Sequence, residues 1–145
     1  MRLACRFLLA VLLATNAFAQ SRLSIDKLDD KDIIKAVKEV AFSTMLEGTV
    51  DDPKLAVYVL VHSPGGAWRS FPAVVEGTRV DPAGGYRWRA ICQFGDYDGR
   101  GVGVSYQVRV AAFTPKHIKR NGNLMESVSR GSLQSNAITI KRVKK

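Results

Sequence analysis

The sequence predicts a mainly β protein, a small antiparallel two-layer sandwich, from three observations. Segments such as residues 86–94 alternate apolar and polar side chains, which is the pattern of a half-buried strand. Short segments of this kind are separated by turns rich in Gly, Pro and Asp, for example residues 81–85. The 145 residues leave room for one domain. A small barrel is the alternative arrangement of such strands.

The N-terminal residues 1–19 are typical of a secretory signal peptide. The basic residues Arg2 and Arg6 come before an apolar run at residues 7–14. Residues 17–19 then follow the small-x-small rule for cleavage before Gln20. The run is too short to span a bilayer, and no later segment is long and apolar enough to do so. We therefore expect an exported protein, periplasmic or secreted, with no transmembrane segment after cleavage.

Residues 20–39 form a polar leader that allows one short helix, and residues 40–145 are assigned to the sandwich. Within the leader, residues 23–25 could add a short edge strand. Ile33, Ile34, Val37 and Val40 recur at helical spacing, although the chain from Val40 to Gly48 is better explained as a strand.

Three further strands have distinct sequence signatures. Residues 55–62 are apolar on both faces, which predicts a central strand covered on two sides or a strand at an interface. Residues 68–75 contain Pro72, which favours an edge position or a bulge. Residues 136–143 form the final strand.

The longest alternating segments, residues 86–94 and 105–113, are joined by the glycine-rich stretch 95–103, and we expect them to pair as a hairpin. Alternation places Trp88 and Cys92 on the apolar face and therefore in the core. The opposite face of the same hairpin would carry Arg87, Arg89 and Arg109.

The charge pattern indicates an anionic partner. The formal net charge is +9, and an exported protein with such an excess meets acidic glycans and lipid surfaces more often than nucleic acid, which we do not expect as a partner. Arginine holds carboxylate and phosphate in a bidentate fork, so Arg87, Arg89 and Arg109 are candidate ligand-binding residues. Tyr97, in the glycine-rich connection, is the best exposed candidate for stacking.

No catalytic, metal or cofactor site is predicted, and we expect a protein that is not an enzyme. A calcium loop starting at Asp96 would place Arg100 and Gln107 where oxygen ligands are required. His62 and His117 stand apart in the sequence, and Cys92 is predicted to be buried.

One resemblance comes from the order of motifs. Gly48-Thr49 precedes the apolar segment 57–62, and Gly85-Tyr86-Arg87-Trp88 precedes the alternating segment 106–110. This order resembles the immunoglobulin-like and fibronectin-III-like modules of bacterial envelope proteins, although the paired cysteines of antibody domains are missing. The resemblance implies a non-catalytic module that binds an anionic envelope component or a protein. The alternatives are a structural or adaptor module of a larger envelope assembly and a small secreted hydrolase.

Overall fold

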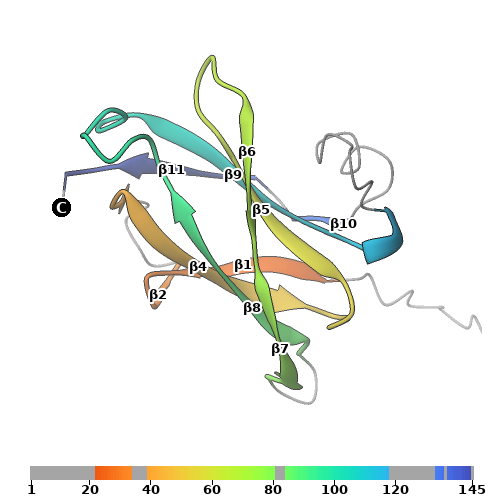
Figure 1. Cartoon of the computed structure of the whole chain (residues 1–145). Coiled ribbons are helices and arrows are strands. Elements are labelled where there is room, and N and C mark those ends of the chain that lie inside the picture. Colours follow the sequence, from red (N-terminus) through yellow and green to blue (C-terminus); the bar gives the residue numbers. More distant parts are fainter. Residues whose placement is uncertain (1–21, 34–38, 81–83, 118–132, 136, 145) are drawn as a thin grey trace, which may run out of the picture.

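The chain folds into two β-sheets packed face to face (Figure 1). The computed structural model describes residues 22–33, 39–80, 84–117, 133–135 and 137–144. The predicted signal peptide, residues 34–38 of the segment that allows a helix, and residues 118–132 lie outside these described residues. Within the described part of the chain, no helix is long and apolar enough to cross a membrane.

Each sheet is built from strands that are far apart in the sequence. Sheet A has the order β2-β1-β4-β8-β7. Its strands are β1 (Leu23–Leu28), β2 (Lys31–Asp32), β4 (Ser43–Val50), β7 (Val74–Arg79) and β8 (Tyr86–Gln93). Sheet B has the order β3-β11-β9-β5-β6, with β10 also paired to β9. Its strands are β3 (Glu39–Val40), β5 (Ala56–His62), β6 (Trp68–Pro72), β9 (Ser105–Phe113), β10 (Leu133–Gln134) and β11 (Ile138–Arg142).

This arrangement confirms the predicted antiparallel sandwich. Neighbouring strands are antiparallel except for β3, which runs parallel to β11. The two sheets have separate edges and do not close into a barrel. Among the described residues, strand pairing begins at Leu23, inside the segment predicted as a polar leader, because β1 pairs along β4 and buries Leu28. A single 3₁₀ turn, η1 (Pro115–His117), follows β9.

The expected hairpin between residues 86–94 and 105–113 is wrong. β8 pairs with β4 and β7 in sheet A, whereas β9 pairs with β5 and β11 in sheet B. The connection between them therefore crosses from one sheet to the other. Both strands turn an apolar face to the same core, where the rings of Phe94 and Tyr106 meet edge to face at 5.5 Å. Packing across the core replaces the predicted hydrogen-bonded pairing.

Two segments predicted as single strands are also divided between the sheets. Residues 68–75 contain the whole of β6, a crossing at Ala73 and the start of β7, and Pro72 lies in an edge strand as predicted. Ala73 donates its backbone N–H to the carbonyl of Val57 at 2.9 Å, which fixes the crossing point. Similarly, residues 40–48 contain the end of β3 and most of β4.

The core is centred on Trp88, whose side chain is fully buried. Its indole Nε1 donates a hydrogen bond to the carbonyl of Ser24 at 3.1 Å, which joins β8 to β1. Gly48 lies between these two strands, and a Cβ at this position would overlap both the Ser24 carbonyl and the indole ring. Glycine is therefore required at position 48 by this close approach.

Replacing Trp88 should destabilise the fold severely. The Trp88→Ala change removes a fully buried indole and leaves the Ser24 carbonyl without its donor. We expect a loss of about 3–5 kcal/mol in the free energy of unfolding, measured by urea denaturation. Ile91→Ala, on the same strand but with the side chain 66% exposed, is the matched control and should change stability little. Similar losses from both changes would contradict this assignment of the strand faces.

Candidate functional site

The three predicted arginines do not share one face. Arg87 and Arg89 alternate with the buried Trp88 on β8, so they lie on the outer face of sheet A. Arg109 alternates with the buried Val108 and Val110 on β9, so it lies on the outer face of sheet B. Because these are opposite surfaces of the sandwich, the single arginine face expected from the hairpin is not formed.

On sheet A the arginines lie among carboxylates. Arg89 places Nη2 2.6 Å from Oε1 of Glu76 and Nε 3.6 Å from Oε1 of Glu47. Arg87 lines a small cavity of about 150 Å³ whose walls also include Asp26 and Glu47. Much of the positive charge on this face is therefore balanced within the protein, and an anionic ligand would meet nearby carboxylates.

On sheet B the guanidinium of Arg109 is held over an aromatic ring. Its Cζ lies 5.8 Å from the centre of the Trp68 ring, and Trp68 packs in turn against His62 at 4.8 Å. The Nε atom of Arg109 is buried and has no hydrogen-bond partner in the described structure. A buried donor without a partner costs free energy, so a ligand that brings an acceptor to it would be bound favourably.

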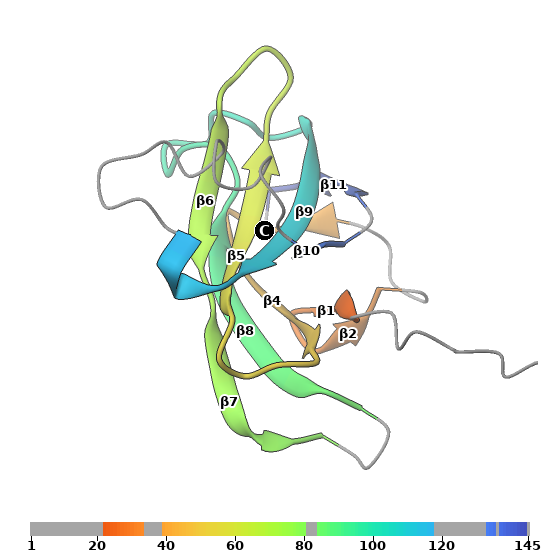
Figure 2. The same cartoon turned by 90° about the vertical axis from the view of Figure 1, so that its right-hand side faces the viewer.

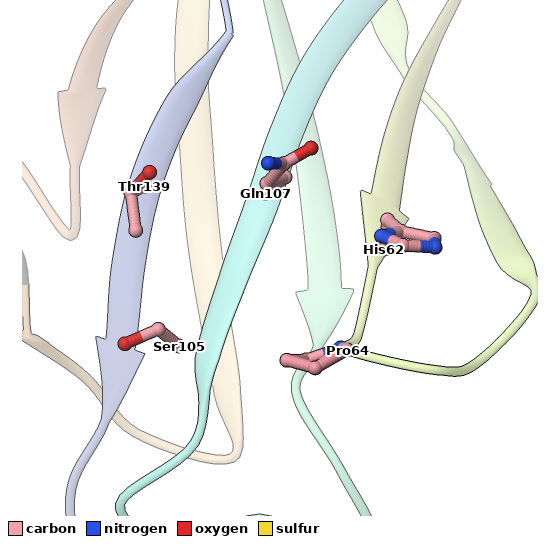
Figure 3. A pocket seen from close by; sticks show the side chains of 5 residues that line it. All are labelled: His62, Pro64, Ser105, Gln107 and Thr139. Carbon is pink, nitrogen blue, oxygen red and sulfur yellow. The ribbon is translucent and has the colours of Figure 1, made fainter.

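Next to Arg109, the outer face of sheet B is hollowed. The hollow has a volume of about 300 Å³ and is lined by His62, Pro64, Ser105, Gln107 and Thr139. Figure 3 looks onto this face and shows the lining side chains on β5, β9 and β11 and at the start of the β5–β6 turn. Its polar groups are an imidazole, an amide and two hydroxyls, which can both donate and accept hydrogen bonds.

Two cations lie on either side of this hollow along the sheet. Lys141 is exposed and is paired in register with Ser105 at one end, while Arg109 follows Gln107 by two residues at the other. The strands β5, β6, β9 and β11 contain no aspartate or glutamate. The nearest carboxylate in the sheet is Glu39 on the edge strand β3, which is exposed and is the register partner of Lys141. We call this surface the sheet B face, defined by Trp68, Lys141, Arg109 and the five residues of the hollow.

Tyr97 belongs to a different surface, the tip of the β8–β9 connection, and its side chain is 90% exposed. Arg142, a buried residue at the end of β11, braces this loop by donating from Nη1 to the carbonyls of Asp96, at 2.8 Å, and Arg100. The Arg142 guanidinium also lies 5.2 Å from the Phe42 ring, against which Tyr97 packs edge to face. The loop lies at the same end of the sandwich as the β5–β6 turn (Figures 1 and 2).

The carboxylates beside Tyr97 make its loop a poor anion site. Asp98 accepts hydrogen bonds from the backbone N–H of Arg100 at 3.2 Å and from its Nε at 2.9 Å. The bond from the Arg100 backbone, with a further contribution from its guanidinium, holds the pKa of Asp98 below its ordinary value. Asp96 also approaches Arg100, at 3.2 Å. Tyr97 is therefore separate in both position and chemistry from Arg109.

The hollow does not contain a serine–histidine pair. A nucleophilic serine needs its base within hydrogen-bonding reach, about 2.6–3.2 Å. In Figure 3 the Ser105 hydroxyl points away from the His62 ring, and the described structure has no hydrogen bond between them. Among the described residues, no three His, Cys, Asp or Glu side chains are grouped so that they could hold a metal ion.

Several residues of the sheet B face were missed as candidates from the sequence. Alternation along residues 105–113 puts Gln107 on the same face as Arg109, but Ser105 and Thr139 give no signal of their own in the sequence. Their association depends on the pairing of β9 with β11 and β5, which alternation within one strand does not reveal.

Comparison of the chain with protein-family models, with curated proteins and with solved structures gave no match.

Cys92 should not act as a nucleophile at neutral pH. Its side chain is fully buried, and burial raises the pKa of the thiol to about 12. In the protein beginning at Gln20, native Cys92 should react with a disulfide reagent at pH 8 far more slowly than in urea, because the reactive thiolate is scarce and shielded. An Ile91→Cys change in a Cys92→Ala background supplies an exposed neighbouring thiol as the control. Rapid labelling of native Cys92 would contradict its burial.

Proposed function

We propose that this chain is an exported, non-catalytic, immunoglobulin-like module that binds an anionic partner through the sheet B face. The strand order supports the immunoglobulin-like part. In such domains the first, second, fifth and fourth strands form one sheet, and the third, sixth and seventh form the other. Strands β1, β4, β8 and β7 follow the first pattern, and β5, β9 and β11 follow the second. β6 lies beside β5, as an added strand does in variable-type domains.

The single observation that carries the binding proposal is that an arginine on one face is paired with carboxylates and an arginine on the other face is not. Arg89 is paired with two glutamates, whereas Arg109 has a buried Nε without a partner and lies on strands free of carboxylates. A guanidinium held over Trp68 loses little freedom when it binds a ligand, because its position is already restricted. Export is supported by the signal-like residues 1–19, and it would bring the module into contact with anionic envelope components.

Two double variants that each remove two positive charges would test this proposal. Arg109→Gln with Lys141→Gln alters the sheet B face, and Arg79→Gln with Arg87→Gln alters sheet A. Retention on a heparin column and affinity for phosphatidylglycerol vesicles are measured for both. We expect the sheet B variant to bind the preferred probe at least about tenfold more weakly, since charge-assisted hydrogen bonds are lost. The sheet A variant should lose about twofold or less through its reduced net charge.

Equal losses in the two double variants would assign the attraction to net charge and overturn the choice of the sheet B face. Failure of the unaltered protein to bind either probe at low ionic strength would overturn anion binding as the function. Thermal unfolding of each variant, followed by circular dichroism, separates lost binding from lost structure.

A second candidate function is that of an adaptor that associates through the β8–β9 loop. It is favoured by the exposed Tyr97 on a loop fixed by Arg142, since rigid exposed aromatic side chains are typical anchors of protein interfaces. The partner tested is a second copy of the chain. Light scattering during size-exclusion chromatography should then show a dimer that Tyr97→Ser abolishes; a monomer at all concentrations would contradict this form of the adaptor function.

A further inference from the structure

We infer that the hollow on the sheet B face selects an acidic oligosaccharide: it holds one sugar ring, while Arg109 and Lys141 contact acidic groups on either side. This inference rests on the proposed function and narrows the partner from any anion to one class of ligand. It depends on the order of side chains across the sheet, the spacing of the cations and the location of exposed apolar residues.

The side chains that face a ligand form a continuous row across four strands. Thr139 on β11 is opposite Gln107 on β9, which is opposite His62 on β5, and His62 is opposite Trp68 on β6. The row thus presents a hydroxyl, an amide, an imidazole and an indole in sequence. Adjacent sugar hydroxyls require donors and acceptors close together, and this row supplies both.

The size and wall of the hollow suit a small ring. Its volume of about 300 Å³ is at the lower end of the range for ligand pockets. Pro64 closes one side with an apolar surface, and the hydroxyl of Ser105 points toward β11 (Figure 3). Lys141 on β11 is the register partner of Ser105. A ring with polar edges and an apolar face matches these walls.

The spacing of the cations requires an extended ligand. Lys141 is level with Ser105, which precedes Arg109 by four positions on β9. Four strand residues extend about 13 Å, so a single compact anion would not reach both cations. A ligand that fills the neutral hollow and also contacts both cations carries its acidic groups at intervals along a polar chain. Oligosaccharides of acidic sugars have this form.

The distribution of exposed apolar side chains favours a glycan over a lipid surface. Proteins that lie on membranes usually insert apolar side chains beside their basic residues. The large apolar residues that are well exposed in the described structure lie on sheet A, just after β7 or in the β8–β9 loop, and none is on β5, β6, β9 or β11: Val74, Val80, Ile91, Tyr97 and Val102. The sheet B face therefore has the charge for a lipid headgroup, but its one large aromatic side chain, Trp68, is partly buried and is not a well-exposed apolar anchor.

Uncharged substitutions in the hollow separate this inference from simple anion binding. Gln107→Ala and Thr139→Val each remove hydrogen-bonding groups and leave the charge unchanged. Gln93→Ala, an exposed glutamine on the outer face of sheet A, is the matched control. Binding of a heparin-derived hexasaccharide, a neutral chitin hexasaccharide and inorganic polyphosphate is measured by isothermal titration calorimetry for each protein, together with binding to phosphatidylglycerol vesicles.

We expect each hollow variant to bind the acidic hexasaccharide about tenfold more weakly, as when one or two hydrogen bonds to a ligand are lost. Polyphosphate binding should stay within about twofold, and Gln93→Ala should change neither. The unaltered protein should prefer the acidic hexasaccharide to the neutral one.

Three outcomes would overturn the inference. Hollow variants that bind the acidic hexasaccharide normally would exclude the hollow as a sugar site, while the double charge variants would still decide whether the sheet B face binds anions. Tight binding to vesicles without binding to the hexasaccharide would identify a lipid surface as the partner. Equal affinity for the neutral and acidic sugars would exclude the role of Arg109 and Lys141.

Discussion

The close approach of Trp88 to Gly48 is the constraint on which the rest of the sandwich depends. The indole fills the centre of the core, and its Nε1–H bond to Ser24 ties the second half of sheet A to the first. Cys92 lies four residues further along β8 as a free, buried thiol, so these strands are held by packing and hydrogen bonds. Once Trp88 faces inward, strand alternation directs its neighbours Arg87 and Arg89 outward.

The same geometry gives the two outer faces different chemistry. On sheet A, the outward Arg89 meets a glutamate on each neighbouring strand, and the buried position of Glu47 makes its pairing with Arg89 part of the fold. On sheet B, Arg109 stands over Trp68 without a carboxylate on its neighbouring strands. Arginine is thus treated differently on the two faces, because Arg89 is paired with two glutamates whereas the strands beside Arg109 carry no carboxylate.

Patterns within single segments predicted the fold class well. The alternation around Trp88 placed it in the core, and the two apolar faces of residues 55–62 marked an interior strand. β5 is interior, and its outer side packs in a second cluster that includes Leu60, Ala111 and Phe113. These predictions are confirmed because the alternation of apolar and polar residues within one strand reports which of its side chains are buried, whichever strands it pairs with.

Pairing between segments could not be derived in the same way. The glycine-rich residues 95–103 are compatible with a hairpin turn and with a crossing between sheets, and alternation in β8 and β9 is identical in both cases. The predicted hairpin placed Arg109 on the same face as Arg87 and Arg89, whereas Arg109 lies on the opposite surface of the sandwich. For the same reason the sequence identified Arg109 but did not associate it with Thr139, which is close only through strand register.

The crossing at Ala73 has a consequence for how copies of this protein meet. β6 and β7 are consecutive in the chain and form one outer edge of each sheet. Pro72 removes one backbone donor from the first edge, and the register shift between Val75 and Arg79 interrupts the second. The opposite edges are formed by β2 and β3, each of two residues. Within the described residues, none of the four edges presents a long regular ladder, so the sandwich is guarded against strand-to-strand polymerisation at high concentration.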